Sequence, residues 1–393
     1  MRILFVTSRN VINTCGELRL IKNRAICLHD TYGVSTDFIV YRSNKCNSKP
    51  QEEIGAESTL TKCLYNVKNP FSISRNFKFL TKLVLDSLSK NVHKAVVLSG
   101  NIVLPLAKKI KKAYPNVKII VDVHGALEEL VEFNDGGFVK RNLRKLLFRP
   151  FKKMEKKYMP YADGIFAVSN ALKHYLISEY FLIDKKFFIV PCAQNRKEIN
   201  ASEKVANRQK YREKYGVLDD EKLFIYSGGL SPWQCVEESV NLFKAIKTKE
   251  PKAKLLLLTG AVEKIRKYEG NGILVDSIPF NLVDEVICAG DYAFMLRGDY
   301  ITNNVAYPNK FIEYVSSGMK IIATPYVDDI AKQIESSGVG CILDKNPEEE
   351  LIKYLQKDCE YLSDIENRQK LLDDVCFENR LKPFAEYLKG EDR

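Results

Sequence analysis

Short apolar runs recur along the first half of the chain, separated by amphipathic segments long enough to form helices. These runs cover residues 2–7, 37–41, 95–99, 118–123, 164–169 and 187–191. Continuous apolar strands that alternate with helices are typical of a parallel sheet covered by helices on both faces. The pattern therefore predicts one doubly wound α/β domain in this half.

The same alternation of apolar runs and helix-length segments resumes after a polar, strongly charged stretch at residues 195–221. The apolar runs of the second half cover residues 223–227, 254–259, 272–276, 291–296 and 320–324. We therefore predict an α/β fold with two Rossmann-like doubly wound parallel-sheet domains, 1–200 and 201–370, that face each other across a cleft. The remaining residues, 371–393, have a helical pattern, and we expect this helix to pack back toward the N-terminal domain.

Size and composition agree with two soluble domains. The chain has 393 residues, of which 45% are apolar and 28% are charged, and a domain usually takes about 100–200 residues. No apolar run approaches the roughly 20 residues that span a bilayer, and the first residues do not resemble a signal peptide. The ten cysteines include no Cys-x-x-Cys pair, which favours reduced thiols over a zinc or redox site. We expect a cytoplasmic protein.

Positive charge is concentrated in the first half of the chain. Residues 1–200 hold 34 Lys and Arg against 17 Asp and Glu, while residues 201–393 hold 27 against 33. The two halves thus carry net charges of +17 and −6. Such an asymmetry indicates an anionic partner, for which a membrane surface, a phosphorylated lipid and a nucleic acid are the candidates.

Much of this charge lies in residues 138–160, where nine basic residues are interleaved with apolar ones and Glu155 is the single acid. The segment reads as an amphipathic helix with a break or kink near Pro150. Two interpretations stand side by side. The segment adsorbs to anionic lipid at the inner face of the plasma membrane, or it is a solvated basic face over buried apolar side chains.

The segment 291–325 carries the clearest local signals. It reads as a strand that ends at Arg297, a polar loop, and a helix at 309–317 that Pro308 opens and Gly318 stops. Proline at the start and glycine at the end are the expected punctuation of a helix.

Charged residues around this helix start suit a nucleotide diphosphate. Arg297 and Lys310 add positive potential to the free N–H groups of a helix N-terminus, where a diphosphate could sit. Glu313 lies one turn further along the helix and could accept hydrogen bonds from sugar hydroxyls.

The same segment resembles the donor-binding region of glycosyltransferase family 4 and its relatives, where an R…A-x-P-x-K-F-x-E-Y-x-x-x-G pattern precedes an apolar strand. The matching residues are Arg297, Ala306, Pro308, Lys310, Phe311, Glu313, Tyr314 and Gly318. Three further segments resemble elements of the family and occur in the same order. Residues 122–129 resemble its D-x-H-G…E-E element, and residues 162–169 resemble the strand that follows. Residues 224–234 resemble the first strand and glycine loop of the donor domain. The resemblance implies a GT-B fold, with the acceptor bound by 1–200 and a nucleotide sugar by 201–370.

The resemblance also implies roles for individual residues. The catalytic candidates are His124, Arg297 and Lys310, with His124 beside the transferred sugar and the two cations at the diphosphate. The candidates for binding the nucleotide sugar are Glu313, which would hold the ribose, and Gly228, Gly229, Asn309, Pro308 and Gly16. A structural histidine is the alternative for His124, and an ordinary turn glycine is the alternative for Gly16. One of Glu128 and Glu129 is an acceptor-side base, or both are simple helix-start carboxylates.

Three positions depart from the family pattern. Many members carry an Arg and a Lys in the glycine loop that both bind diphosphate, where this chain has Gly229 and Gln234. Many also carry a second glutamate eight residues before the one at Glu313, where this chain has Val305. Our hypothesis is that Arg297, Lys310, Asn303 or Asn304 compensates.

These observations converge on one expected function. The four histidines show no ligand spacing and no Asp-x-Asp follows a strand, so we expect no metal and no cofactor beyond the nucleotide-sugar donor, which we expect to be UDP-linked. The expected enzyme is a retaining glycosyltransferase whose acceptor is a glycan or lipid-linked oligosaccharide in surface or capsular polysaccharide synthesis. The alternative is a catalytically weak homologue that binds glycan or acts as a scaffold. Nucleic acid is a disfavoured partner, because no base-stacking platform or known module is recognisable.

Overall fold

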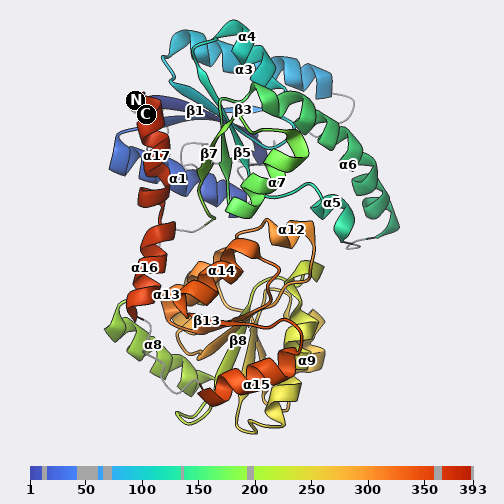
Figure 1. Ribbon diagram of the computed structural model, residues 1–393, viewed down its shortest axis with the longest axis vertical. Coiled ribbons are helices and arrows are strands. Elements are labelled where there is room, and N and C mark those ends of the chain that lie inside the picture. The colour runs from blue at the N-terminus through green and yellow to red at the C-terminus, as the bar shows by residue number, and fades with distance from the viewer. Residues whose placement is uncertain are drawn as a thin grey trace. The chain divides into compact units, whose positions relative to one another are not determined.

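The computed structural model describes residues 1–10, 16–41, 61–64, 73–133, 137–192, 199–357 and 365–390. The chain divides into two compact units. The first unit comprises Met1–Val131, Asn142–Gln194 and Phe377–Arg393, and the second comprises Glu132–Arg141 and Asn195–Cys376. Each unit contains one parallel sheet with helices packed on it, which confirms the prediction of two Rossmann-like α/β domains (Figure 1).

The sheet of the first unit has seven strands in the order β3-β2-β1-β4-β5-β6-β7, all parallel. The strands are β1 (Arg2–Asn10), β2 (Ser35–Tyr41), β3 (Thr61–Leu64), β4 (Ala95–Ser99), β5 (Lys118–Val123), β6 (Gly164–Ala167) and β7 (Lys186–Ile189). The helices are α1 (Gly16–Tyr32), α3 (Ile73–Lys90), α4 (Leu106–Ala113), α5 (Glu129–Glu132), α6 (Phe138–Tyr158), α7 (Asn170–Tyr180) and α17 (Phe377–Lys389), with a 3-10 turn at Met159–Tyr161. The apolar pattern did not predict β3, because Thr-Lys-Cys-Leu at the edge of the sheet is not an apolar run.

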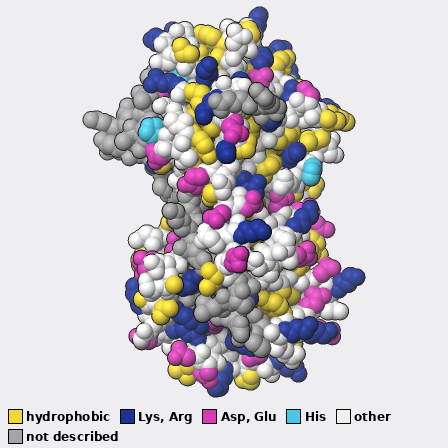
Figure 2. All heavy atoms as spheres, turned by 60° about the vertical axis from the view of Figure 1, so that its left-hand side comes forward, with side chains coloured by type: hydrophobic (Ala, Val, Ile, Leu, Met, Phe, Trp, Pro, Cys, Tyr) yellow, Lys and Arg dark blue, Asp and Glu magenta, His cyan; other side chains and the backbone are white. Residues whose placement is uncertain are grey.

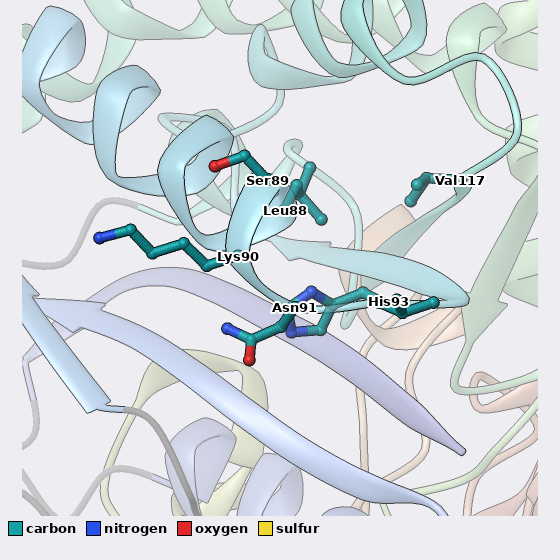
Figure 3. A pocket seen from close by; sticks show the side chains of 7 residues that line it. Leu88, Ser89, Lys90, Asn91, His93 and Val117 are labelled. Carbon is teal, nitrogen blue, oxygen red and sulfur yellow. The ribbon is translucent and has the colours of Figure 1, made fainter.

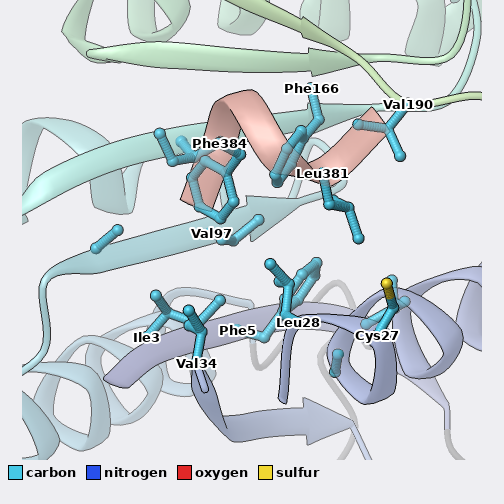
Figure 4. Close-up of a cluster of buried hydrophobic side chains, with 14 of the residues drawn as sticks. Ile3, Phe5, Cys27, Leu28, Val34, Val97, Phe166, Val190, Leu381 and Phe384 are labelled. Atoms are coloured by element: carbon cyan, nitrogen blue, oxygen red, sulfur yellow. The ribbon is translucent and has the colours of Figure 1, made fainter. Parts of the chain in front are cut away.

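Alternate residues of the central strand β1 build the two sides of this unit's core. Ile3 and Phe5 point toward α1 and α17, whereas Leu4 and Val6 point toward α3 and α4, as the two-residue period of a strand requires. Figure 4 shows the first of these clusters, in which Phe384 of α17 lies against Phe166 of β6. Their ring centres are 4.7 Å apart and their planes meet at 68°. The last helix of the chain is therefore part of the core of the first unit.

The sheet of the second unit has six parallel strands in the order β10-β9-β8-β11-β12-β13. The strands are β8 (Leu223–Ser227), β9 (Lys254–Leu258), β10 (Ile273–Asp276), β11 (Tyr292–Met295), β12 (Lys320–Ala323) and β13 (Gly340–Ile342). The helices are α8 (Ala201–Lys214), α9 (Val236–Lys247), α10 (Val262–Ile265), α11 (Val283–Ile287), α12 (Ile301–Asn304), α13 (Asn309–Ser317), α14 (Asp328–Ser337), α15 (Pro347–Lys357) and α16 (Ile365–Val375), with 3-10 turns at Pro232–Gln234, Arg266–Tyr268 and Phe280–Leu282.

Stacked aromatic rings hold the centre of this second sheet. Phe224 of β8 stacks on Tyr292 and Phe294 of β11, with ring centres 5.0 and 5.4 Å apart. Because strands β8 and β11 are parallel neighbours, the loops that follow them emerge at the same edge of the sheet. This edge is where ligands bind in open α/β sheets, and both loops carry residues that the sequence singled out.

Within the described ranges, every helix is either too short or too polar to pass through a lipid bilayer.

Candidate functional site

Two cations of the second unit, Arg297 and Lys310, form the centre of the candidate site. Arg297 follows β11 and is 6% exposed, and Lys310 lies in the first turn of α13. Burial lowers the pKa of Arg297. Burial likewise lowers the pKa of Lys310 well below its usual range, and the charge of Arg297 lowers it further against an opposing effect of Glu313. In the part of the chain that the structure describes, neither cation forms an ion pair with a carboxylate.

Lys310 reaches across to the glycine loop that follows β8. Its Nζ atom lies 1.7 Å from the place where a Cβ on Gly228 would stand, so any side chain at this position would displace the amino group. The amino group lies 4.6 Å from the ring centre of Tyr226 and 3.4 Å from its hydroxyl, and it donates to Gln234 Oε1. The Tyr226 hydroxyl lies 2.5 Å from the carbonyl oxygen of Gly229 and 2.9 Å from Gln234 Oε1. The glycines and Lys310 thus form one local structure.

The first turn of α13, which carries Lys310, adds backbone N–H groups to the candidate site. Pro308 is the N-cap, and no side chain caps the first turn, so N–H groups there are available to a ligand. The Oδ1 atom of Asn309 is buried and has no hydrogen-bond partner. Glu313, one turn further on, is 7% exposed. Val305, which stands where the family pattern often has a second glutamate, is buried as an apolar residue.

The two asparagines that our hypothesis offered as compensation hold the loop after β11. The Asn303 amide donates to the carbonyl oxygen of Gly298 at 2.8 Å. The Asn304 amide donates to Asp299 Oδ1 at 3.0 Å, while its own Oδ1 is buried and has no partner. Arg297 is held by Thr324, whose hydroxyl contacts both the backbone N–H and the carbonyl oxygen of Arg297. These contacts stiffen the loop that carries the arginine.

In the first unit, His124 is the last member of a buried polar chain at the end of β5. The Asp122 carboxylate lies 2.7 Å from His124 Nε2 and 2.8 Å from Arg24 NH1, and Arg24 also donates to the carbonyl oxygen of Val190. Burial would raise the pKa of Asp122, but His124 and Arg24 together lower it to about 2. An ionised carboxylate can only accept hydrogen bonds, so His124 donates from Nε2. Its ring is held in one orientation and its side chain is 18% exposed.

The neighbouring acid Glu128 is engaged inside the first unit. It forms an ion pair with Lys152 at 2.8 Å and accepts a hydrogen bond from Tyr175 at 2.6 Å. Lys152 also pairs with Glu179 at 3.2 Å. These contacts join α7 to α6, which favours a structural role for Glu128.

The predicted site residues therefore fall into two groups. Arg297, Lys310, Glu313, Gly228, Gly229, Pro308 and Asn309 all belong to the second unit, whereas His124 and Gly16 belong to the first. Gly16 is the first residue of α1, and the loop before it, residues 11–15, lies outside the described residues.

Sequence reasoning missed several residues that hold these groups together. Tyr226 lies in an apolar strand, where nothing in the sequence distinguishes it from a core residue. Arg24 is one basic residue among several in an amphipathic helix. Gln234 was noted only as a missing lysine. No local pattern marks these residues, because their partners are distant in sequence.

Among the described residues, no group of three or more His, Cys, Asp or Glu side chains could hold a metal ion, and metal independence stays a prediction. The pocket in Figure 3 has a volume of about 220 Å³ and includes His93, whose Nε2 lies 2.8 Å from Asp37. None of the predicted site residues lines it. It lies just before β4 begins, at the edge of the sheet opposite to the one where open α/β sheets bind ligands.

Comparison with known proteins identifies the fold. No protein-family model and no curated protein sequence matches this chain. Among solved structures, sucrose-phosphate synthase from Thermosynechococcus elongatus is similar with a TM-score of 0.69 at 12% identity, over 100% of both chains. A glycosyltransferase from Rickettsia africae has a TM-score of 0.69 at 17% identity, over 99% of this chain and 98% of that one.

A third similar structure contains a ligand. HepE from Anabaena, solved in complex with UDP-glucose, has a TM-score of 0.68 at 13% identity, over 99% of this chain and 100% of that one. At such low sequence identities, the structural similarity shows the fold alone. The chain has the GT-B fold of these glycosyltransferases, with two Rossmann-like domains.

Proposed function

We propose that this protein is a metal-independent glycosyltransferase that moves a sugar from a UDP-linked donor to a hydroxyl of a glycan acceptor. Two observations carry the proposal: Arg297 is buried just after β11, and Lys310, in the first turn of α13, lies at the glycine loop. Neither has a carboxylate partner within ion-pair distance among the described residues. Cations shielded from water are costly without a counter-ion, and a diphosphate would supply one. The UDP-glucose held by HepE, a protein of the same fold, supports a uridine nucleotide.

The proposed chemistry is electrostatic. When the bond between the sugar's anomeric carbon and the diphosphate oxygen breaks, negative charge builds on the departing oxygen. Arg297 and Lys310 stabilise that charge together with the N–H groups at the start of α13. Glu313 accepts hydrogen bonds from the ribose, and Gly228 and Gly229 let the backbone approach the phosphates. By the family resemblance, the anomeric configuration is retained.

The acceptor belongs, in this proposal, to residues 1–200. Asp122 holds the His124 ring so that the ring can contact the transferred sugar or orient the acceptor hydroxyl. Gly16 at the start of α1 allows close approach of the backbone to the substrate.

The outer face of α6 supports a membrane-associated, lipid-linked acceptor in surface or capsular polysaccharide synthesis. Leu143, Leu146 and Leu147 are 53%, 72% and 37% exposed, and their spacing places them on one side of the helix. Arg149 and Lys153 are also exposed. On the face of the molecule in Figure 2, by contrast, basic and acidic side chains are interspersed without a continuous patch of either sign. An exposed apolar stripe beside basic residues is the pattern of a helix that lies on an anionic lipid surface.

One feature favours the rival function of a catalytically weak glycan-binding or scaffolding homologue. Val305 is buried and apolar, and so offers no carboxylate where many family members have one. Release of UDP from a panel of nucleotide sugars in the presence of glycan acceptors separates the two functions, because a scaffold binds without turnover.

The decisive experiment is a thermal-shift and turnover series with UDP-, GDP- and CMP-linked sugars. A ligand that binds only the folded state raises the melting temperature by mass action, so UDP should raise it and uridine, which lacks the phosphates, should raise it far less. Arg297→Ala and Lys310→Ala should each lower turnover at least about tenfold. Arg149→Ala on α6 is the matched control and should leave turnover with a soluble acceptor unchanged. Absence of any shift with all three nucleotides would contradict the proposal.

A further inference from the structure

The glycine loop of the second unit contains no cation of its own. Residues 228–234 read Gly-Gly-Leu-Ser-Pro-Trp-Gln, and the loop ends in the 3-10 turn Pro232–Gln234. A loop that approaches phosphates needs positive charge or hydrogen-bond donors, and this loop offers backbone N–H groups and neutral side chains only. Its charge must come from elsewhere in the fold.

Lys310 supplies a positive group at this loop. The Nζ atom stands almost where the Cβ of residue 228 would be, which the glycine makes possible. The backbone of Gly228 has φ +146°, a conformation that L-residues rarely adopt. The lysine therefore lies directly over the loop backbone, although it belongs to the first turn of α13.

The groups that hold this amino group are neutral. Gln234 accepts a hydrogen bond from Lys310 through Oε1, and the Tyr226 ring lies under the ammonium at 4.6 Å. The Tyr226 hydroxyl lies 2.9 Å from the same Oε1 and so fixes the amide. A neutral acceptor and an aromatic face orient an ammonium without cancelling its charge. A carboxylate in place of the amide would neutralise it.

We propose that Gln234, braced by Tyr226, is a positioning residue that holds the Lys310 ammonium over the glycine loop, where it serves as the cation that the loop itself lacks. This inference rests on the proposed function and adds a residue to it. It also explains why an amide stands where a lysine is usual in similar loops. A second ammonium at position 234 would repel Lys310, whereas the amide oxygen accepts a hydrogen bond from it.

Three variants test the role through binding of UDP and of uridine, measured by calorimetry at fixed ionic strength. Gln234→Glu keeps the size of the side chain but neutralises Lys310, and Lys310→Gln removes the charge. Each should weaken UDP binding about tenfold, as expected for loss of a charge-assisted contact, and leave uridine binding within about twofold of wild type. The exchange Gln234→Lys/Lys310→Gln returns an ammonium to the same place and should recover most of the lost affinity for UDP.

A second readout does not depend on the nucleotide. Gln234→Ala should raise the rate of reductive methylation of Lys310 relative to the exposed Lys145, measured by peptide mass spectrometry, because the amide no longer covers the amine. A Gln234→Glu protein that binds UDP like wild type, a folded exchange variant that binds no better than Lys310→Gln, or an unchanged methylation rate overturns the inference. Failure of the unsubstituted protein to bind UDP contradicts the proposed function instead, and the methylation rate still reports whether Gln234 holds Lys310.

Discussion

The ring of Phe133 lies against the indole of Trp233, with ring centres 5.0 Å apart. Phe133 also contacts Tyr300 at 4.9 Å, and it is 4% exposed. Its neighbour Glu132 accepts hydrogen bonds from the N–H groups of Ile301 and Thr302 and from the Thr302 hydroxyl. A segment encoded in the first half of the chain thus packs within the second unit.

This contact matters because its partners lie in the two loops of the candidate site. Trp233 adjoins Gln234 in the glycine loop, and Tyr300 lies in the loop that begins at Arg297. Phe133 therefore braces both loops from the side.

Removing this aromatic contact should weaken both stability and donor binding. Phe133→Ala deletes a buried ring and should destabilise the second unit by about 3 kcal/mol, while UDP binding falls severalfold because both loops lose a support. Calorimetric melting and UDP titration check the two effects. Phe280→Ala, at a ring that is 54% exposed, is the control and should change neither. If Phe133→Ala and Phe280→Ala have the same melting temperature and the same affinity for UDP, Phe133 does not brace the two loops.

A side chain at Gly228 should displace Lys310. In Gly228→Ala the added Cβ would overlap the amino group, and the φ of +146° is unfavourable for alanine. We expect UDP binding to fall at least about tenfold, in line with loss of one preorganised charged donor. Gly137→Ala is a suitable control, because a Cβ there meets nothing within 4 Å. Normal UDP affinity in Gly228→Ala would show that the position of Lys310 over the loop is unimportant.

The ion pair of Asp122 should make the first unit sensitive to acid. The pKa of Asp122 is lowered from 3.8 to about 2 in the folded protein by His124 and Arg24, against the effect of burial. A depressed pKa stabilises the fold above pH 3.8, and this contribution is lost as the pH falls toward 2. Its size is about 2 kcal/mol.

Asp122→Asn should therefore destabilise the first unit at pH 7 by about 3 kcal/mol, because it also leaves the Arg24 guanidinium buried without its partner. The difference from wild type should shrink as the pH falls below 3.8. Urea melts across this pH range provide the measurement, with Asp163→Asn, at a more exposed ion pair to Lys111, as the comparison. A difference that stays constant with pH would argue against the assigned ionisation of Asp122.

The ionisation of Glu155 should make the folded protein less stable as the pH rises toward neutral, which is the opposite of the effect of Asp122. Burial raises the pKa of this carboxyl from 4.5 to about 7, although Tyr180 and Lys152 oppose the effect. Because the folded state holds the proton more tightly than the unfolded state, stability falls as the pH rises from 4.5 through 7.

Glu155→Gln should remove this pH dependence. The variant should gain up to about 3 kcal/mol relative to wild type at pH 8 and little at pH 4.5. Melting of both proteins between these pH values measures the effect. Glu179→Gln is the control, since its side chain is 44% exposed and touches the same lysine, Lys152. A gain that is equal at all pH values would exclude titration of Glu155 as its cause.

The exposed stripe of α6 should bind anionic membranes. We expect the protein to co-sediment with anionic but not zwitterionic vesicles, and salt should weaken the binding, at roughly 1 kcal/mol for each basic residue near the lipid. Leu146→Glu should reduce this binding strongly, because Leu146 is 72% exposed. Leu218→Glu, at a leucine of the second unit that is 65% exposed, should bind like wild type. Vesicle binding that survives Leu146→Glu unchanged would place the contact elsewhere.

Local patterns were sufficient for much of the fold. The apolar runs predicted β4 and β5 with their observed bounds and the first six residues of β1, since a buried parallel strand is mostly apolar. Pro308 and Gly318 predicted the helix at 309–317 with its observed bounds, because proline favours a helix start and glycine permits the left-handed conformation after its end. The edge strand β3 was missed, since Thr61 and Lys62 break the apolar pattern.

The contacts that build the candidate site depended on the tertiary structure. Sequence alone determined that two parallel sheets form and that Arg297, Lys310 and Glu313 lie near one helix start, because these features depend on neighbours along the chain. It did not show that Lys310 lies over Gly228, that Arg24 holds Asp122, or that Phe133 packs on Trp233. Each of these contacts joins segments that are distant in sequence, so it exists only once the chain has folded and packed its helices and loops around the two sheets.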